Sequence, residues 1–93
     1  MPKGYWVVNL DVDDAEQYAV YQKFVRPFLT ENGGHFVVRG GRHEVVEGTS
    51  RGRQVVVEFD SYETALRVYH SDGYQTGMKD RVVSSAANFV IVE

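Results

Sequence analysis

The stretch GYWVVNLDV, residues Gly4–Val12, decides the fold that this sequence predicts. It is rich in β-branched and aromatic residues, which favour an extended strand. Alternate side chains of a strand point to opposite faces of a sheet, so the stretch divides into two sets. One set is wholly apolar: Trp6, Val8 and Leu10. The other set is mixed: Tyr5, Val7 and Asn9. We therefore expect one buried face and one face of mixed polarity.

A helix is expected directly after this strand. Asp13 and Glu16 have the spacing of a capping box, in which each residue's side chain accepts a hydrogen bond from the other's backbone. Apolar residues then recur at helical spacing: Tyr18, Tyr21, Val25, Phe28 and Leu29. This pattern continues past Pro27, so the proline should kink the helix rather than end it. The run NGG at residues 32–34 should end it.

The remaining elements complete a βαββαβ order. We expect a strand at residues 35–40, an extended edge segment at 42–47 and a hairpin turn at 48–52. After the turn we expect a strand at Arg53–Phe59 and a helix at Tyr62–His70 that is capped by Ser61. We also expect helical structure at residues 71–80 and a last strand at 88–92. This order is typical of the ferredoxin-like α+β fold, an antiparallel sheet with its helices on one face. Residues 1–93 should form a single domain.

The composition limits the classes of function. The 93 residues carry a net charge of -3, which argues against a nucleic-acid partner because such binding needs a basic face. No apolar run approaches the ~20 residues of a membrane helix, and the start has no signal-peptide pattern. We therefore expect a cytoplasmic protein without membrane contact. The chain has no cysteine, so a disulfide and a thiolate zinc site are excluded.

The mixed face of the predicted sheet carries many valines. In the second strand, parity places Val38 on the apolar face and Arg39 on the mixed face. An apolar patch of this size suggests a partner, and the simplest is a second copy packed sheet on sheet. The expected dimer interface is Tyr5, Val7, Asn9, Val37, Val56, Glu58 and Val90. The alternative is a solvent face whose valines only favour the strand conformation.

Several motifs resemble a bacterial family, domain of unknown function thirteen-thirty. They are GYW at residues 4–6 with Asp11, GG at 33–34, VRGG at 38–41, EVVEG at 44–48, the strand Arg53–Phe59 with Ser61, Ser71 with YQ at 74–75, and VIVE at 90–93. The resemblance spans essentially the whole chain. It implies a dimeric α+β barrel, in which the sheets of two ferredoxin-like halves face each other. The wider superfamily includes cofactor-independent monooxygenases, haem-degrading enzymes and small-molecule isomerases, so the fold alone does not name a reaction.

Arg39 is the first candidate for ligand binding. It lies beside Gly40-Gly41, where a ligand can approach the backbone closely, and its guanidinium suits a carboxylate. The alternative is an ion pair with Glu58 or Asp11 inside a dimer. Further candidates are the helical tyrosines, which could line a pocket or simply fill the core: Tyr18, Tyr21, Tyr69 and Tyr74.

Catalytic and cofactor signals are sparse. His43 follows the glycine pair and could act as a general base near Arg39. The histidines have no metal-ligand spacing, and no phosphate-binding or Ser-hydrolase motif occurs, so we expect neither a metal nor another cofactor. The haem-degrading relatives use a first-strand Asn with a Trp and a helix His. Here Asn9 should face away from the helices, and the one Trp is itself on that strand.

Three functional hypotheses follow. The first is a homodimer that binds or converts a small acidic or aromatic molecule under the helices, with Arg39 orienting the anion. The second is a non-catalytic interaction dimer with a filled core. The third, which the residues support least, is a haem-degrading or quinol monooxygenase-like enzyme.

Overall fold

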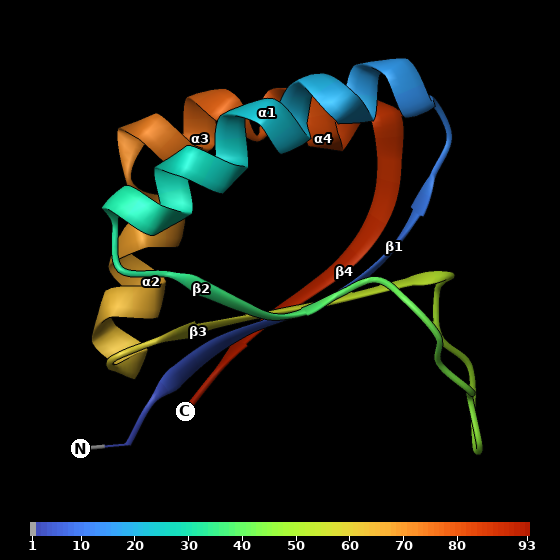
Figure 1. Ribbon diagram of the computed structural model, residues 1–93, viewed down its shortest axis with the longest axis horizontal. Coiled ribbons are helices and arrows are strands. Elements are labelled where there is room, and N and C mark those ends of the chain that lie inside the picture. The colour runs from blue at the N-terminus through green and yellow to red at the C-terminus, as the bar shows by residue number, and fades with distance from the viewer. Residues whose placement is uncertain (1) are drawn as a thin grey trace.

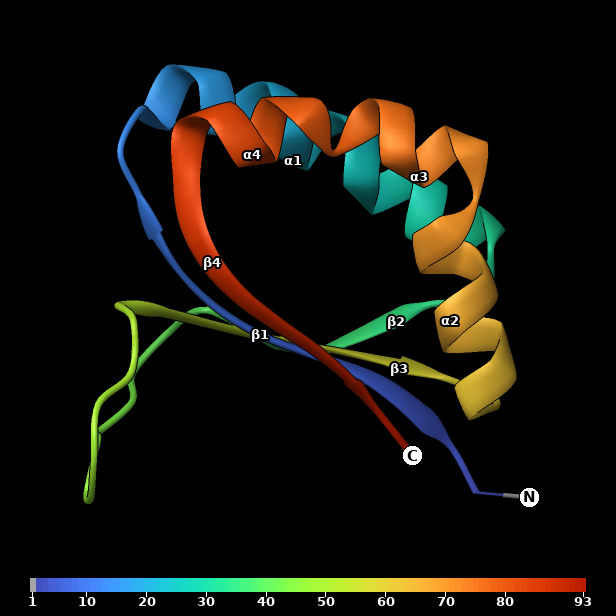
Figure 2. The ribbon, with the colours of Figure 1, turned by 180° about the vertical axis from the view of Figure 1, so that it is seen from behind.

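Strand β1, Gly4–Val12, is an inner strand of a four-stranded antiparallel sheet with the order β2-β3-β1-β4 (Figure 1). The computed structural model describes residues 2–93. The other elements are α1 at Ala15–Glu31, β2 at His35–Arg39, β3 at Arg53–Phe59, α2 at Tyr62–His70, α3 at Asp72–Gly77, α4 at Lys79–Ser84 and β4 at Ser85–Val92. The expected ferredoxin-like α+β fold is confirmed. The helices lie on one side of the sheet, and β1 and β4 curve up toward them (Figure 2).

The core forms around the single tryptophan. Trp6 is 1% exposed, and its indole Nε1 donates to the Ala65 carbonyl oxygen at 2.9 Å. Its ring lies 4.9–6.1 Å from the ring centres of Phe59, Tyr69, Tyr74 and Phe89. Such aromatic pairs each add ~0.5–1.5 kcal/mol beyond area burial. The apolar face of β1 predicted from its alternation is therefore the covered face of the sheet.

Helix α1 begins one residue later than the capping pattern predicts. Asp14 is the N-cap, and its carboxylate accepts from the Gln17 backbone N–H at 3.1 Å. The prediction of Asp13 is wrong: its N–H, which a capping box would bond to Glu16, is bonded to the Ser84 carbonyl oxygen at 2.7 Å, and the Asp14 N–H is bonded to the same oxygen at 3.3 Å. Pro27 lies inside the helix, which continues to Glu31 as expected.

The C-terminal helical region differs from its prediction in two respects. It extends to Ser84 as two short helices, α3 and α4, and β4 then starts at Ser85 rather than Asn88. The Ser84 hydroxyl donates to the Asp80 carbonyl oxygen, and the Ser85 hydroxyl donates to that of Arg81. These serines satisfy the last carbonyl groups of the helix, so the chain can turn directly into the strand.

Strand β2 contains a β-bulge that the sequence pattern did not reveal. Phe36 pairs with Val57, but Val38 pairs with Val56 and Arg39 with Val55. Two residues of β2, Val37 and Val38, thus lie opposite one residue of β3, Val56. Beyond the bulge, the side chains of β2 point to the faces opposite to those that strict alternation predicts. The parity prediction is therefore wrong for Val38, which is 39% exposed on the outer face, and for Arg39, which lies on the face under the helices.

The segment between β2 and β3, residues 40–52, forms an arm rather than the predicted edge strand. Gly40 and Gly41 adopt positive φ angles of 74° and 90°, which direct the chain away from the ladder. The arm hangs on the side of the sheet opposite to the helices (Figures 1 and 2). Its return is anchored by β1, since Asn9 accepts from the Arg51 N–H and Asp11 from the Gly52 N–H. Within residues 2–93, no helix has the length and apolar character to cross a membrane.

A candidate anion-binding cavity under the helices

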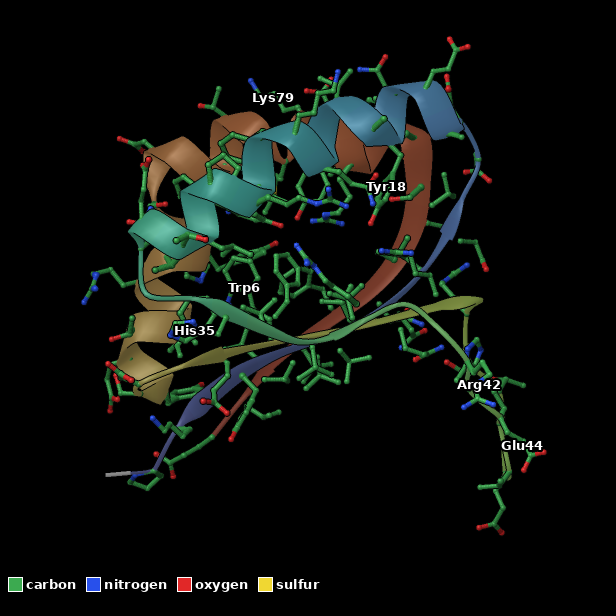
Figure 3. All side chains as sticks on the ribbon, viewed as in Figure 1. Trp6, Tyr18, His35, Arg42, Glu44 and Lys79 are labelled. Atoms are coloured by element: carbon green, nitrogen blue, oxygen red, sulfur yellow. The ribbon has the colours of Figure 1, made fainter. Side chains whose placement is uncertain are left out.

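A cavity lies between α1 and the covered face of the sheet. Its volume is about 40 Å³, and about 530 Å³ when the open space at its mouth is included. The floor and walls are mainly apolar and include Trp6, Leu10, Phe36, Val57 and Phe89. Figure 3 shows Trp6 and Tyr18 in the space between the helices and the sheet. On this scale one water needs ~10–15 Å³, so the inner part holds a few waters or one end of a small organic molecule.

The polar side chains around this cavity are mostly cationic. Four arginines line it: Arg26, Arg39, Arg53 and Arg81. No aspartate or glutamate is among its lining residues in the described chain, residues 2–93. The ion pairs found there are Lys3–Asp60 and Arg51–Asp11, so no cavity arginine is paired with an acidic side chain. The cavity is thus electropositive in a chain whose net charge is -3.

Arg81 is the most buried of these cations. It is 6% exposed, and its guanidinium carbon lies 5.3 Å from the Phe89 ring centre and 5.8 Å from that of Tyr21. These faces stabilise the charge by cation–π interaction. One terminal nitrogen approaches the Met78 Sδ at 3.8 Å, but the buried Nε has no partner within residues 2–93. A buried donor without an acceptor is costly, and this one is enclosed by protein atoms rather than open to the cavity.

Arg39 lies at the mouth of the cavity. Its guanidinium carbon stacks 4.6 Å from the Phe36 ring centre, and the rest of the side chain is exposed. The alternative of an ion pair with Glu58 or Asp11 is absent from the described residues of this single chain.

The four candidate tyrosines separate into two pairs. Tyr18 and Tyr21 are 7% exposed and line the cavity, whereas Tyr69 and Tyr74 do not. Tyr74 is fully buried behind Tyr21, and the two hydroxyl oxygens lie 2.8 Å apart. Burial raises the pKa of Tyr21 well above its usual range, and Tyr74 adds to the rise. Burial also raises the pKa of Tyr74, opposed by the charge of Arg81. Both phenols are therefore neutral at pH 7.

His43 does not reach this cavity. It lies on the arm, where its Nδ1 is 3.4 Å from the Gly41 carbonyl oxygen, and it lines a separate exposed hollow with Val45 and Gln54. Figure 3 shows the neighbouring Arg42 and Glu44 on this arm, away from the helices. Among residues 2–93, no three His, Cys, Asp or Glu side chains are grouped so that they could hold a metal ion.

The outer face of the sheet places the predicted interface residues together. Val38, Val56, Val7 and Val90 are successive partners across the strands, so they form a row that we call the valine row. Tyr5 lies opposite Glu58 beside this row. Asn9 is held on its other side, where it accepts from the Asn88 amide at 3.1 Å. Val37, in the bulge, is 52% exposed.

Sequence reasoning missed Arg81, the most buried polar contributor to the cavity. A signal was present: Arg81 follows Tyr74 by seven residues and Met78 by three, which is one face of a helix. The sequence pattern ends the helical stretch at residue 80, so Arg81 falls just outside the predicted helix.

A family model described as "Domain of unknown function (DUF1330)" matches residues 3–93. The chain belongs to this family. The description assigns no activity. Comparison with curated proteins finds no match.

Solved structures share the fold of this DUF1330 chain at low sequence identity. RPA0582, a protein of unknown function from Rhodopseudomonas palustris, is 15% identical with a TM-score of 0.77, over 97% of this chain and 80% of that one. SnoaB, a cofactor-independent oxygenase from Streptomyces nogalater, is 15% identical with a TM-score of 0.64, over 100% and 93%. An EthD-family protein from Bacillus halodurans C-125 is 14% identical with a TM-score of 0.58, over 100% and 98%.

Proposed function

We propose that this DUF1330 protein binds a small organic anion with an apolar or aromatic body in the cavity under the helices. Arg39 at the mouth and Arg81 at the inner wall would hold the anionic group, and Tyr18 and Tyr21 would line the body of the ligand. Tyr69 and Tyr74 would support that wall from behind. SnoaB, an oxygenase that needs no cofactor, has the same fold. The proposal therefore includes conversion of the bound molecule without a bound cofactor.

One observation carries this proposal: among residues 2–93, four arginines and no carboxylate line a cavity whose floor and walls are mainly apolar. Like charges gathered around a low-dielectric space repel one another, and burying an unpaired charge such as Arg81 is unfavourable. An entering anion relieves both effects, while the apolar wall favours a ligand with little other polarity. The cavity also favours ligand binding over an interaction dimer with a filled core.

The test is a titration with benzoate and with benzamide, its neutral counterpart of similar shape. Calorimetry should detect benzoate binding and at least tenfold weaker benzamide binding, since a hydrogen bond to a charged group contributes ~1.5–3 kcal/mol. Arg39→Gln should weaken benzoate binding severalfold, whereas Arg67→Gln, on the exposed side of α2, should not. Equal binding of the two compounds, or none of either, would contradict the proposal.

We further propose that the protein is a homodimer whose sheets face each other through the valine row. Val7, Val38 and Val90 are 39%, 39% and 52% exposed in the single chain, which is unusual for a contiguous row on a small monomer. The arm extends on this same side of the sheet and carries Val46 at 79% exposure. A second copy on this face would cover the row and contact the arm.

A further inference from the structure

The hydrogen bond between Tyr21 and Tyr74 has a direction that the surroundings decide. Either hydroxyl could donate across the 2.8 Å between the two oxygens. Tyr74 is fully buried, and within residues 2–93 the Tyr21 oxygen is the partner found for its hydroxyl. The nearby Arg81 guanidinium acts on Tyr74 but offers no acceptor atom. If Tyr21 donated, the Tyr74 proton would be buried without an acceptor, so Tyr74 donates and Tyr21 accepts.

This direction leaves the Tyr21 proton for the cavity. Tyr21 lines the cavity, and its own O–H is not used in the bond to Tyr74. A phenol that already accepts a hydrogen bond is a stronger donor, because the bonds polarise one another. The cavity wall therefore presents a strengthened O–H donor from α1.

Arg81 presents a second donor to the same space. It lines the cavity beside Tyr21, with its guanidinium carbon 5.8 Å from the Tyr21 ring centre. Its Nε–H is enclosed by protein atoms, and one terminal nitrogen is turned toward the Met78 sulfur, so the other terminal nitrogen is the donor left for the cavity. Because one terminal nitrogen of Arg81 is engaged, the guanidinium is poorly placed to hold a carboxylate with both terminal nitrogens. The Arg81 and Tyr21 donors together are better suited to a single oxygen atom.

We propose that Tyr21 and Arg81 form an oxyanion site, which binds the ionised oxygen of a phenol or an enol in preference to its neutral form. This inference rests on the proposed function and specifies its ligand as a weakly acidic, conjugated molecule. Neutral donors and a cation fixed in a water-poor cavity stabilise a delocalised oxyanion more than water does. No histidine or carboxylate lines the cavity within the described residues, so the proton of the bound phenol passes to water.

The test uses 4-nitrophenol, whose phenolate absorbs visible light and whose phenol does not. The purified full-length protein is titrated with pH in the presence of the probe, beside the same titration in buffer. We expect the bound probe to ionise at a lower pH, with the phenolate-to-phenol ratio raised about tenfold, which corresponds to one pKa unit. Tyr21→Phe should remove most of this increase. Tyr62→Phe, at the start of α2 and outside the cavity, should retain it.

The outcomes separate the two proposals. Binding of 4-nitrophenol with an unchanged or higher pKa overturns the oxyanion site and leaves anion binding intact if benzoate still binds. Absence of binding by both benzoate and 4-nitrophenol overturns both. The titration of the unmodified protein decides the first point alone, so a variant that fails to fold does not remove the test.

Discussion

Arg39 lies directly opposite Val55 in the ladder between β2 and β3, on the face of the sheet that the helices cover. Strict alternation from Phe36 would place it on the other face, among the outer valines. The bulge at Val37 and Val38 reverses that alternation and so brings a cation to the cavity mouth. A backbone irregularity of one residue thus decides which of the two faces receives the charge, as is common for bulges near binding sites.

Exchanging two neighbouring residues tests this placement. The double variant Val38→Arg/Arg39→Val keeps the composition but moves the guanidinium to the outer face. Its affinity for benzoate should fall about tenfold, the equivalent of 1.4 kcal/mol, by calorimetry. The matched control is Val38→Arg alone, which adds the same outer charge and keeps Arg39, and it should bind benzoate like the natural protein. Equal affinities for the two variants would show that Arg39 does not act at the mouth.

The valine row predicts a dimer that a single charge disrupts. Size-exclusion chromatography with light scattering should give twice the chain mass of 10.6 kDa at micromolar concentration. Val7→Lys places a charge in the centre of the proposed interface and should yield the monomer mass, because an unpaired buried charge is strongly unfavourable. Val83→Lys is the control, since Val83 is 72% exposed on α4 and lies outside the sheet. A monomeric natural protein would refute the dimer.

Gly77 permits the close packing of α3 against α1. A Cβ at this position would collide with the Phe24 ring, and that ring is stacked on Phe28 at 5.0 Å. Gly77→Ala should therefore lower the free energy of unfolding by ~1–3 kcal/mol, the usual cost of overpacking, despite the better helix propensity of alanine. Urea unfolding followed by Trp6 fluorescence would measure it. The exposed neighbour Thr76→Ala should change stability by less than about 0.5 kcal/mol.

Acid should weaken the anchor of the arm. Hydrogen bonds from the Gly52 N–H and from Arg51 lower the pKa of Asp11 below its usual 3.8. A carboxyl whose pKa is lower in the folded state stabilises the fold above its unfolded pKa and loses that contribution as pH falls through the folded value. Asp11→Asn should therefore melt earlier than the natural protein at pH 7.

The difference in melting temperature between these two proteins should shrink below roughly pH 4. Glu47→Gln, an exposed carboxylate on the arm, serves as the control and should leave the pH dependence unchanged. A constant difference between the Asp11 variant and the natural protein across this range would mean that the ionised carboxylate does not stabilise the fold.

The elements that could be predicted are those whose signals are local. The alternation in Gly4–Val12 and Arg53–Phe59 and the Ser61 cap of Tyr62–His70 gave bounds that the structure confirms. The bulge could not be predicted, because it depends on which residue of β3 each residue of β2 meets. The cavity could be predicted only in part. Tyr18 and Tyr21 line it, but the role of Arg81 depends on where the helix ends, and that end is set by the hydrogen bonds of Ser84 and Ser85.

The sheet is a single layer of backbone, and its two faces would have different functions. The covered face would bind the ligand, and the outer face would bind a second copy of the chain. Along β1, Trp6, Val8 and Leu10 belong to the cavity, while Tyr5, Val7 and Asn9 belong to the outer face. A mutation could therefore change ligand binding without changing dimer assembly, or the reverse, even at adjacent positions of the strand. Homologues that diverge in ligand should show substitution rates that alternate with a period of two along this strand, and that alternation should change phase at the bulge in β2.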